Sequence, residues 1–299
     1  MQNFILPPFL KRGDTVGICA PARKVSGQEM QPAVSALESW GLKVRLGKHL
    51  FGSCNQFSGS DAQRAADLQE LISDESVNAI ISARGGYGCS RLLPLLDFSP
   101  LKKNPKWLVG YSDFTVLHLA LYRLGVQSLH AAMPISFDDE QGVQSLRAAL
   151  FGENLSQKFA AHELNVTGVA QGRLIGGNLS IVYSLQGTPH ALLPDNAILF
   201  IEDLDEYLYH VDRMMMNFEL SGQLSKIKGL LAGGMSGMKD NSVAFGKSAQ
   251  EIIREHAEKL NIPVAFSFPA GHQKPNAALR FGAEVELSVK ENFSELSYL

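Results

Sequence analysis

A serine at the junction of a short apolar segment and a helix-like segment is the strongest chemical signal in this sequence. Residues 107–109 are apolar, as in a buried strand, Gly110 begins a turn, and apolar residues recur at helical spacing over 114–124. A sharp strand-to-helix turn directs the hydroxyl of Ser112 out of the sheet, beside the first amides of the helix. This pattern indicates a nucleophile elbow, although a phenylalanine replaces the second glycine of the usual motif. A helix cap formed by Ser112 or Asp113 is the alternative.

A serine nucleophile needs a base within hydrogen-bond distance and a third group that orients this base. Of the eight histidines, His272 has the best position, because it follows the predicted strand 263–268 in a turn containing proline and glycine. His130 also follows a predicted strand, at 126–129, so it is a second candidate for a cleft, with a structural role as the alternative. Most of the other histidines lie in predicted helices and polar loops.

The candidate for the orienting acid is Glu202, which ends the apolar run 197–201. A carboxylate beside such a strand is costly to bury unless it has a partner. Three more acidic residues follow closely, so a solvated acidic turn and a metal site are the alternatives. No histidine or cysteine stands at paired ligand spacing, which argues against a metal.

A glycine-rich segment, Arg84 to Gly88, follows the predicted strand 77–82. Consecutive glycines let the backbone approach a ligand closely and turn amides toward an oxyanion. The segment matches neither G-x-G-x-x-G nor G-K-[ST], so a nucleotide site is a weak interpretation. A plain turn is the other alternative.

The elements that must position these residues alternate along the chain. Strands are predicted at 15–20, 43–46, 77–82 and 107–109, and helices at 26–40, 60–72 and 114–124. Strands separated by helices predict right-handed crossovers and a mostly parallel sheet. Ligands bind at the carboxyl ends of the strands in such sheets, where both the glycine segment and Ser112 lie.

The second half of the chain repeats this organisation after a weakly patterned stretch. We expect an N-terminal α/β domain at 1–150, a linker at 151–169 and a C-terminal α/β domain at 170–299. Strands are predicted at 197–201, 229–232, 263–268 and 280–289, the last as a half-buried closing strand, and helices at 178–185, 207–220 and 248–260.

Composition narrows the functional classes. The 299 residues include 27 Lys and Arg against 30 Asp and Glu, a net charge of −3, so no surface for nucleic acid or an anionic membrane is expected. No apolar run approaches the ~20 residues that a membrane span needs, and no signal peptide is visible. Three cysteines without a C-x-x-C motif indicate reduced thiols and a cytoplasmic protein.

Six segments, in this order, resemble the LD-carboxypeptidase family of serine peptidases over nearly the whole chain. They are GDTVGI and APA at 13–22, ARGGYG at 83–88, VGYSD at 109–113, GRLIGGNL at 172–179, IED at 201–203 and PAGH at 269–272. At 130–134 the sequence is HAAMP, where relatives usually have a glycine after the histidine, so a different local cleft shape is expected.

The resemblance implies a catalytic triad of Ser112 as nucleophile, His272 as base and Glu202 as the acid that orients the base. It also implies an oxyanion hole made by the Asp113 amide and an amide of the glycine segment, for which we select Gly86. No metal or organic cofactor is required. Similar proteins place the serine in the N-terminal domain and the other two residues in a barrel-like C-terminal domain, with the site between them.

The function that this resemblance implies is that of a cytoplasmic LD-carboxypeptidase. It would release the terminal D-Ala from the murein tetrapeptide in cell-wall recycling and form a homodimer. Arg84, Gly85 and Tyr111 are the expected substrate-binding residues, with Arg84 the candidate partner of the terminal carboxylate. One alternative is cleavage of peptide–nucleotide amides by the same triad, as in microcin-resistance relatives, although no tryptophan is evident here to stack on the base. The other is a non-catalytic module that binds an anion or peptide at the glycine segment.

Overall fold

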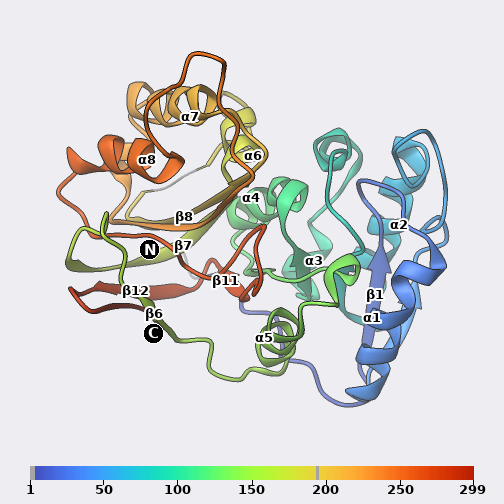
Figure 1. Cartoon of the computed structure of the whole chain (residues 1–299). Coiled ribbons are helices and arrows are strands. Elements are labelled where there is room, and N and C mark those ends of the chain that lie inside the picture. The colour runs from blue at the N-terminus through green and yellow to red at the C-terminus, as the bar shows by residue number, and fades with distance from the viewer. Residues whose placement is uncertain (1–3, 193–194) are drawn as a thin grey trace.

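Two sheets, one built mainly from each half of the chain, carry the fold (Figure 1). The computed structural model describes residues 4–192 and 195–299. The chain is α/β in both halves, as predicted. No helix within these two ranges is long and apolar enough to cross a bilayer.

The first sheet has six strands and is parallel except at one edge. Its order is β11 (Leu279–Phe281), β5 (Ser128–His130), β4 (Trp107–Gly110), β3 (Val77–Ser82), β1 (Thr15–Cys19) and β2 (Lys43–Leu46). Only the pair β11–β5 is antiparallel among these strands. The helices of this half are α1 (Gly27–Ser39), α2 (Asp61–Ser73), α3 (Pro100–Lys103), α4 (Thr115–Leu124) and α5 (Glu140–Phe151).

Local sequence signals explain where these helices begin and end. Ser26 and Ser60 each form a capping box with the residue three positions later, and they start α1 and α2 as predicted. Gly125, with φ of 80°, ends α4 in the left-handed conformation that glycine adopts at low cost.

The second sheet has seven strands. Its order is β10 (Val264–Ala265), β9 (Gly229–Ser236), β8 (Ala197–Leu204), β7 (Gly168–Asn178), β12 (Glu284–Val289), β13 (Phe293–Tyr298) and β6 (Gln157–Ala160). The pairs from β10 to β7 are parallel and the rest are antiparallel. The helices α6 (Leu179–Ser184), α7 (Leu208–Leu220) and α8 (Ala249–Glu258) cover it on one side (Figure 1).

Three expectations for this half need correction or refinement. The sheet does not close into a barrel, although an isolated bridge joins Val166 to Val264. The predicted closing strand 280–289 is two strands, because Gly282, with φ of 85°, turns the chain between β11 and β12. The stretch 151–169, expected as a linker, contains the edge strand β6.

The two halves are joined by segments that cross between them. β11 follows β10 in the chain but pairs with β5 of the first sheet, where Leu279 is opposite His130. α4 contacts β7 and α6 of the second half, and the hydroxyl of Thr115 accepts a hydrogen bond from the Asn178 amide at 3.0 Å. One hydrophobic core includes Phe114, Phe200 and Phe281, so it is continuous across the junction.

We predict that Phe281→Ala destabilises both halves together. The Phe281 ring is buried, and its centroid lies 5.1 Å from that of His118 in the first half and 6.2 Å from that of Phe200 in the second. Truncating a buried phenylalanine typically lowers the free energy of unfolding by about 3–5 kcal/mol. Urea unfolding of this variant should show a single transition at lower urea. The control is Phe51→Ala, because Phe51 is half-exposed. A loss no larger than that of the control would contradict the shared core.

Candidate active site

The turn after β4 holds Ser112 in a strained backbone conformation. Tyr111 is extended, with φ of −148°, and Ser112 has φ of 64°, after which a 3₁₀ turn over Ser112–Phe114 leads into α4. A positive φ is uncommon for a residue with a Cβ atom, and such strain is often found at functional sites. A Cβ atom at Gly110 would lie only 2.6 Å from the Phe114 ring. The phenylalanine at the position of the motif's second glycine therefore packs over Gly110.

The glycine segment lies directly against this serine. A Cβ atom at Gly85 would stand 2.9 Å from the Cβ and 3.1 Å from the Oγ of Ser112. Gly86 has φ of 112°, and a Cβ atom there would overlap the Arg23 side chain. Within the described ranges, the Gly86 amide donates no hydrogen bond. The segment thus packs against Ser112, and its Gly86 amide is available as a donor to an oxyanion.

On the other side of the pocket, Glu202 orients His272. The Nδ1 atom of His272 lies 2.6 Å from Oε2 of Glu202, and the backbone amide of His272 donates to the same oxygen at 3.0 Å. Glu202 is completely buried near the end of β8, so it is not part of a solvated turn. Gly271 has φ of 100°, and a Cβ atom there would lie 2.6 Å from Oε2 of Glu202. Only glycine lets the loop fold this closely over the carboxylate.

Two buried side chains that we did not predict tie the histidine loop to the first half. The Gly271 amide donates to Oδ1 of Asn276 at 2.8 Å, and the Asn276 amide donates to Oδ2 of Asp139 at 2.7 Å. Asp139 also caps α5, because its other oxygen accepts from the Gly142 amide. The capping position of Asp139 could have been recognised in the sequence, but its contact with a residue 137 positions away could not.

Electrostatics make His272 a stronger base than a free imidazole. Burial lowers its pKa, but the hydrogen bond that His272 donates to Glu202 and the charge of Glu202 outweigh burial, and the net pKa is raised. Burial and the neighbouring Glu202 raise the pKa of Asp203 to about 7. The Asp203 carboxyl accepts from Asn178 Nδ2 and the Ser180 amide, both at 2.8 Å, so it has a structural position behind the site.

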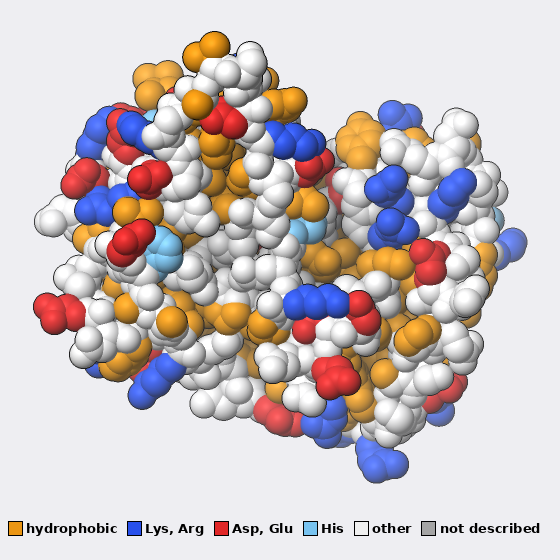
Figure 2. All heavy atoms as spheres, in the orientation of Figure 1, with side chains coloured by type: hydrophobic (Ala, Val, Ile, Leu, Met, Phe, Trp, Pro, Cys, Tyr) orange, Lys and Arg blue, Asp and Glu red, His pale blue; other side chains and the backbone are white. Residues whose placement is uncertain are grey.

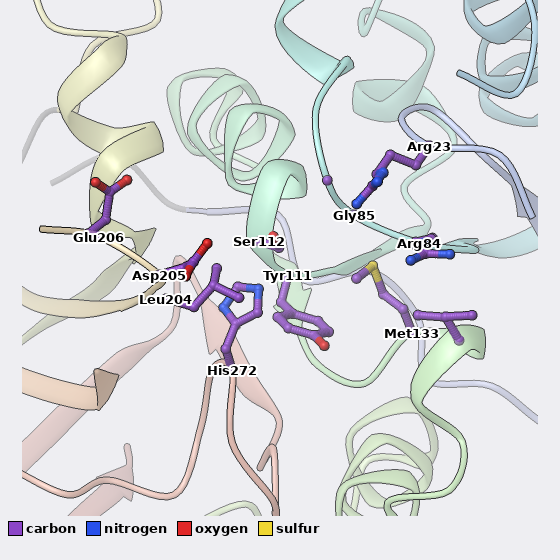
Figure 3. A pocket seen from close by; sticks show the side chains of 12 residues that line it. Arg23, Arg84, Gly85, Tyr111, Ser112, Met133, Leu204, Asp205, Glu206 and His272 are labelled. Carbon is purple, nitrogen blue, oxygen red and sulfur yellow. The ribbon is translucent and has the colours of Figure 1, made fainter. Parts of the chain in front are cut away.

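A pocket of about 490 Å³ is lined by Ser112 and His272, in the hollow between the two lobes of the molecule (Figure 2). Six of the eight predicted site residues line it: Arg84, Gly85, Gly86, Tyr111, Ser112 and His272. Ser112, Tyr111 and His272 lie between a wall with two arginines and a wall with two acids (Figure 3). Such a size suits a small molecule or short peptide.

Glu202 and Asp113 do not line the pocket. Glu202 lies behind His272, and one carboxylate oxygen of Asp113 instead accepts from the Cys89 amide at 2.8 Å. The lining residues that we did not predict are Arg23, Met133, Ile135, Leu204, Asp205 and Glu206. Met133 belongs to the HAAMP segment, which therefore does shape the cleft.

Two further histidines close to the elbow, His130 and His118, do not line the pocket. His130 is fully buried, packed against the Tyr111 and Phe200 rings, and burial lowers its pKa well below the usual value. His118 lies 2.9 Å from the Gly110 carbonyl oxygen through Nε2 and 2.8 Å from the Ser128 hydroxyl through Nδ1. Burial lowers its pKa to about 4, so it is a neutral support for the elbow.

The described part of the chain contains no group of three metal-ligating side chains arranged around a common point. Asp205 is paired with Lys239 at 2.6 Å, and Glu206 with His210 at 2.5 Å. An alcohol and an imidazole in one pocket, with a buried carboxylate behind the imidazole, favour acyl transfer.

Comparison with known proteins agrees with this geometry. Residues 16–131 match the LD-carboxypeptidase N-terminal domain, and residues 171–287 match the LD-carboxypeptidase C-terminal domain. The chain is 33% identical to a probable murein peptide carboxypeptidase of Bacillus subtilis, over 95% of this chain and 92% of that protein.

The chain belongs to the LD-carboxypeptidase family. It is a serine carboxypeptidase, a hydrolase of peptide bonds. A murein tetrapeptide carboxypeptidase of Pseudomonas aeruginosa is 29% identical over 89% of this chain and 91% of its own length.

Solved structures show the same two-domain fold. The muramoyltetrapeptide carboxypeptidase of Oxalobacter formigenes has a TM-score of 0.86 at 30% identity and covers 95% of this chain and 98% of its own. The microcin C7 self-immunity protein, in complex with aspartyl sulfamoyl adenosine, also has a TM-score of 0.86, with 98% of both chains covered. At 22% identity this second likeness concerns the fold alone.

We predict that Glu202→Gln lowers the pKa of His272. The substitution keeps the volume but removes the charge that favours the imidazolium, so the histidine should titrate at a lower pH than in the wild type. A pH titration of the histidine ring signals by NMR measures this shift. Glu219→Gln is the matched control, since Glu219 makes the same kind of contact, at 2.8 Å, with His256. An unchanged His272 pKa in Glu202→Gln would contradict the coupling.

Proposed function

We propose that this LD-carboxypeptidase releases the terminal D-Ala from murein tetrapeptide, through a triad of Ser112, His272 and Glu202. The observation that carries the proposal is that Ser112 and His272 line one pocket while a buried carboxylate holds His272 through Nδ1. Relatives named for murein tetrapeptide and muramoyltetrapeptide support this substrate. We further propose that the enzyme works in the cytoplasm as a homodimer, in cell-wall recycling.

The first step is attack by the Ser112 hydroxyl on the carbonyl of the bond before D-Ala. Because Nδ1 of His272 faces Glu202, its Nε2 is the atom left to accept the serine proton. The Glu202 carboxylate stabilises the imidazolium that forms. The amides of Asp113 and Gly86 donate to the oxyanion of the tetrahedral intermediate.

The second step breaks the peptide bond. His272 returns the proton to the departing amine, D-Ala leaves, and the rest of the peptide remains as an ester on Ser112. Water then attacks this ester with His272 again acting as base, which releases the tripeptide and restores the serine.

A carboxypeptidase must also recognise the free carboxylate next to the scissile bond. Arg23 and Arg84 supply guanidinium groups on the wall that carries the glycine segment, and guanidinium pairs with carboxylate through charge-assisted hydrogen bonds. Arg84 already forms an ion pair with Glu29, 3.6 Å away. Arg23 forms no ion pair within residues 4–192 and 195–299. Arg23 is therefore our stronger candidate for the terminal carboxylate.

The pocket gives less support to a peptide–nucleotide substrate. Trp107 is buried in β4, Trp40 follows the end of α1, and neither lines the pocket. Apart from His272, Tyr111 is the one aromatic residue among the described residues that line the pocket. The Tyr111 ring packs edge-on against the His272 ring, with the centroids 5.0 Å apart. The Tyr111 ring is thus already packed against His272 and is not available to stack on a nucleotide base.

We predict that Ser112→Ala abolishes D-Ala release, with a loss on the order of 10³-fold or more. Mass spectrometry of tetrapeptide incubated with each enzyme should show the loss of one alanine with the wild type only, and a fluorophosphonate probe should label the wild type only. Ser35→Ala, on the exposed side of α1, is the control. Full activity of Ser112→Ala would exclude this mechanism. Turnover of a peptide–nucleotide amide in place of tetrapeptide would select the alternative substrate.

A second prediction concerns the two arginines. Removing a charge-assisted hydrogen bond costs about 1.5–3 kcal/mol, so Arg23→Ala should reduce kcat/KM roughly 10- to 150-fold, and Arg84→Ala should reduce it less. The wild type should also discriminate against a tetrapeptide with an amidated C-terminus, and Arg23→Ala should lose much of this discrimination. Arg91→Ala is the control, because Arg91 is exposed and does not line the pocket. Undiminished discrimination in both variants would show that the carboxylate is bound elsewhere.

A further inference from the structure

One peptide group behind the pocket is held from both sides by buried charges. The carbonyl oxygen of Gly88 accepts a hydrogen bond from Nη1 of Arg64 at 3.2 Å. The N–H of Cys89 donates to Oδ2 of Asp113 at 2.8 Å. This carbonyl and this N–H belong to the same peptide bond, so a cation and an anion fix opposite edges of one plane.

Both charged groups are withdrawn from water. The Arg64 side chain is fully buried and Asp113 is about as buried. Arg64 also donates to the Pro21 carbonyl, pairs with Asp61 and lies over the Phe57 ring at 4.7 Å. Oδ1 of Asp113 has no hydrogen-bond partner among the described residues. Burying such charged groups opposes folding.

The held peptide connects the two elements of the proposed oxyanion hole. It ends the glycine segment, three residues after Gly85, which packs against Ser112. Asp113 follows Ser112 directly in the elbow, so its carboxylate ties the segment to the turn that carries the nucleophile. Gly88, with φ of 147°, permits the contact with Arg64, because a Cβ atom there would lie 2.6 Å from Nη1.

We infer that Arg64 and Asp113 are positioning residues that lock the Gly88–Cys89 peptide and so hold the Gly86 amide at the distance from Ser112 that the oxyanion requires. The inference rests on the proposed function, because it assigns this amide to the oxyanion. Neither side chain lines the pocket, so both act through the backbone that they hold. Donors fixed before the reaction stabilise the developing charge without reorganising, and misplacement by about 1 Å can cost roughly 10²-fold in rate.

This role differs from simple stabilisation in its kinetic signature. The oxyanion exists only in the transition state and the intermediate, so a misplaced donor lowers kcat and leaves KM nearly unchanged. A purely structural role would reduce the folded fraction and leave kcat per folded molecule intact.

The experiment compares the full-length variants Asp113→Ala, Asp113→Asn and Arg64→Met. We measure kcat and KM for D-Ala release from tetrapeptide, the rate of labelling by a fluorophosphonate and thermal unfolding. Asp113→Ala and Arg64→Met should each lower kcat of the folded enzyme about 10- to 100-fold, with KM within about twofold of the wild type and labelling slowed in parallel. Asp113→Asn keeps an acceptor for the Cys89 amide and should regain at least half of the logarithmic loss.

Lys106→Met is the matched control. Lys106 is another fully buried cation of the first half, and its Nζ donates to the carbonyls of Leu71 and Asp74, away from the pocket. This variant should unfold at a lower temperature and keep the wild-type kcat. Equal kcat losses in Lys106→Met and Arg64→Met would show that the loss comes from lower stability and not from a misplaced oxyanion donor.

Wild-type kcat in folded Asp113→Ala, or an Asn variant as impaired as the Ala variant, overturns the inference. If Asp113→Ala and Arg64→Met do not fold, Asp113→Asn and Arg64→Lys replace them. Each of these variants is expected to lower kcat several-fold at constant KM. Wild-type kcat in both would overturn the inference. A wild type that is neither labelled nor active would instead overturn the proposed function itself.

Discussion

The antiparallel pairing of β11 with β5 is the constraint on which the arrangement of the site depends. Ser112 belongs to the first half of the chain and His272 to the second, and such groups meet only if the relative position of the halves is fixed. β11 follows the histidine loop by a few residues and is hydrogen-bonded into the sheet that carries the serine elbow. Asn276 and Asp139 add a second connection, through two buried hydrogen bonds that begin at Gly271. The histidine is thus attached to both halves.

The strained backbone at Ser112 and the tightly packed glycines Gly85 and Gly271 all allow a close approach between groups of the site. Ser112 in a left-handed conformation projects its side chain toward the glycine segment, and the absence of a side chain at Gly85 leaves space for it. At the opposite wall, Gly271 plays the same part for Glu202. Each close approach removes water from between a charged or reacting group and its partner, which strengthens their electrostatic interaction. The continuous core beneath supports these positions against relaxation.

The sequence indicated those features whose cause is local. Capping residues such as Ser60, the apolar strand before Ser112 and the strand that carries Glu202 could all be recognised, because periodicity and short-range hydrogen bonding decide them, although β8 continues to Leu204. The division of 280–289 between two sheets could not, since alternation does not indicate which partner strand is paired. Arg23 and Asn276 were also missed. Their roles depend on contacts with residues distant in the sequence, and nothing in their immediate neighbours distinguishes them.

The late position of β11 in the chain determines when the first sheet can be completed during synthesis. The first sheet lacks its sixth strand until about 280 residues have been synthesised, so a ribosome-bound N-terminal half has β5 as a bare edge with unsatisfied amides and carbonyls. Exposed edges of this kind recruit strands from other chains. Completion of the first sheet and the meeting of Ser112 with His272 therefore both wait for the last part of the chain to be made.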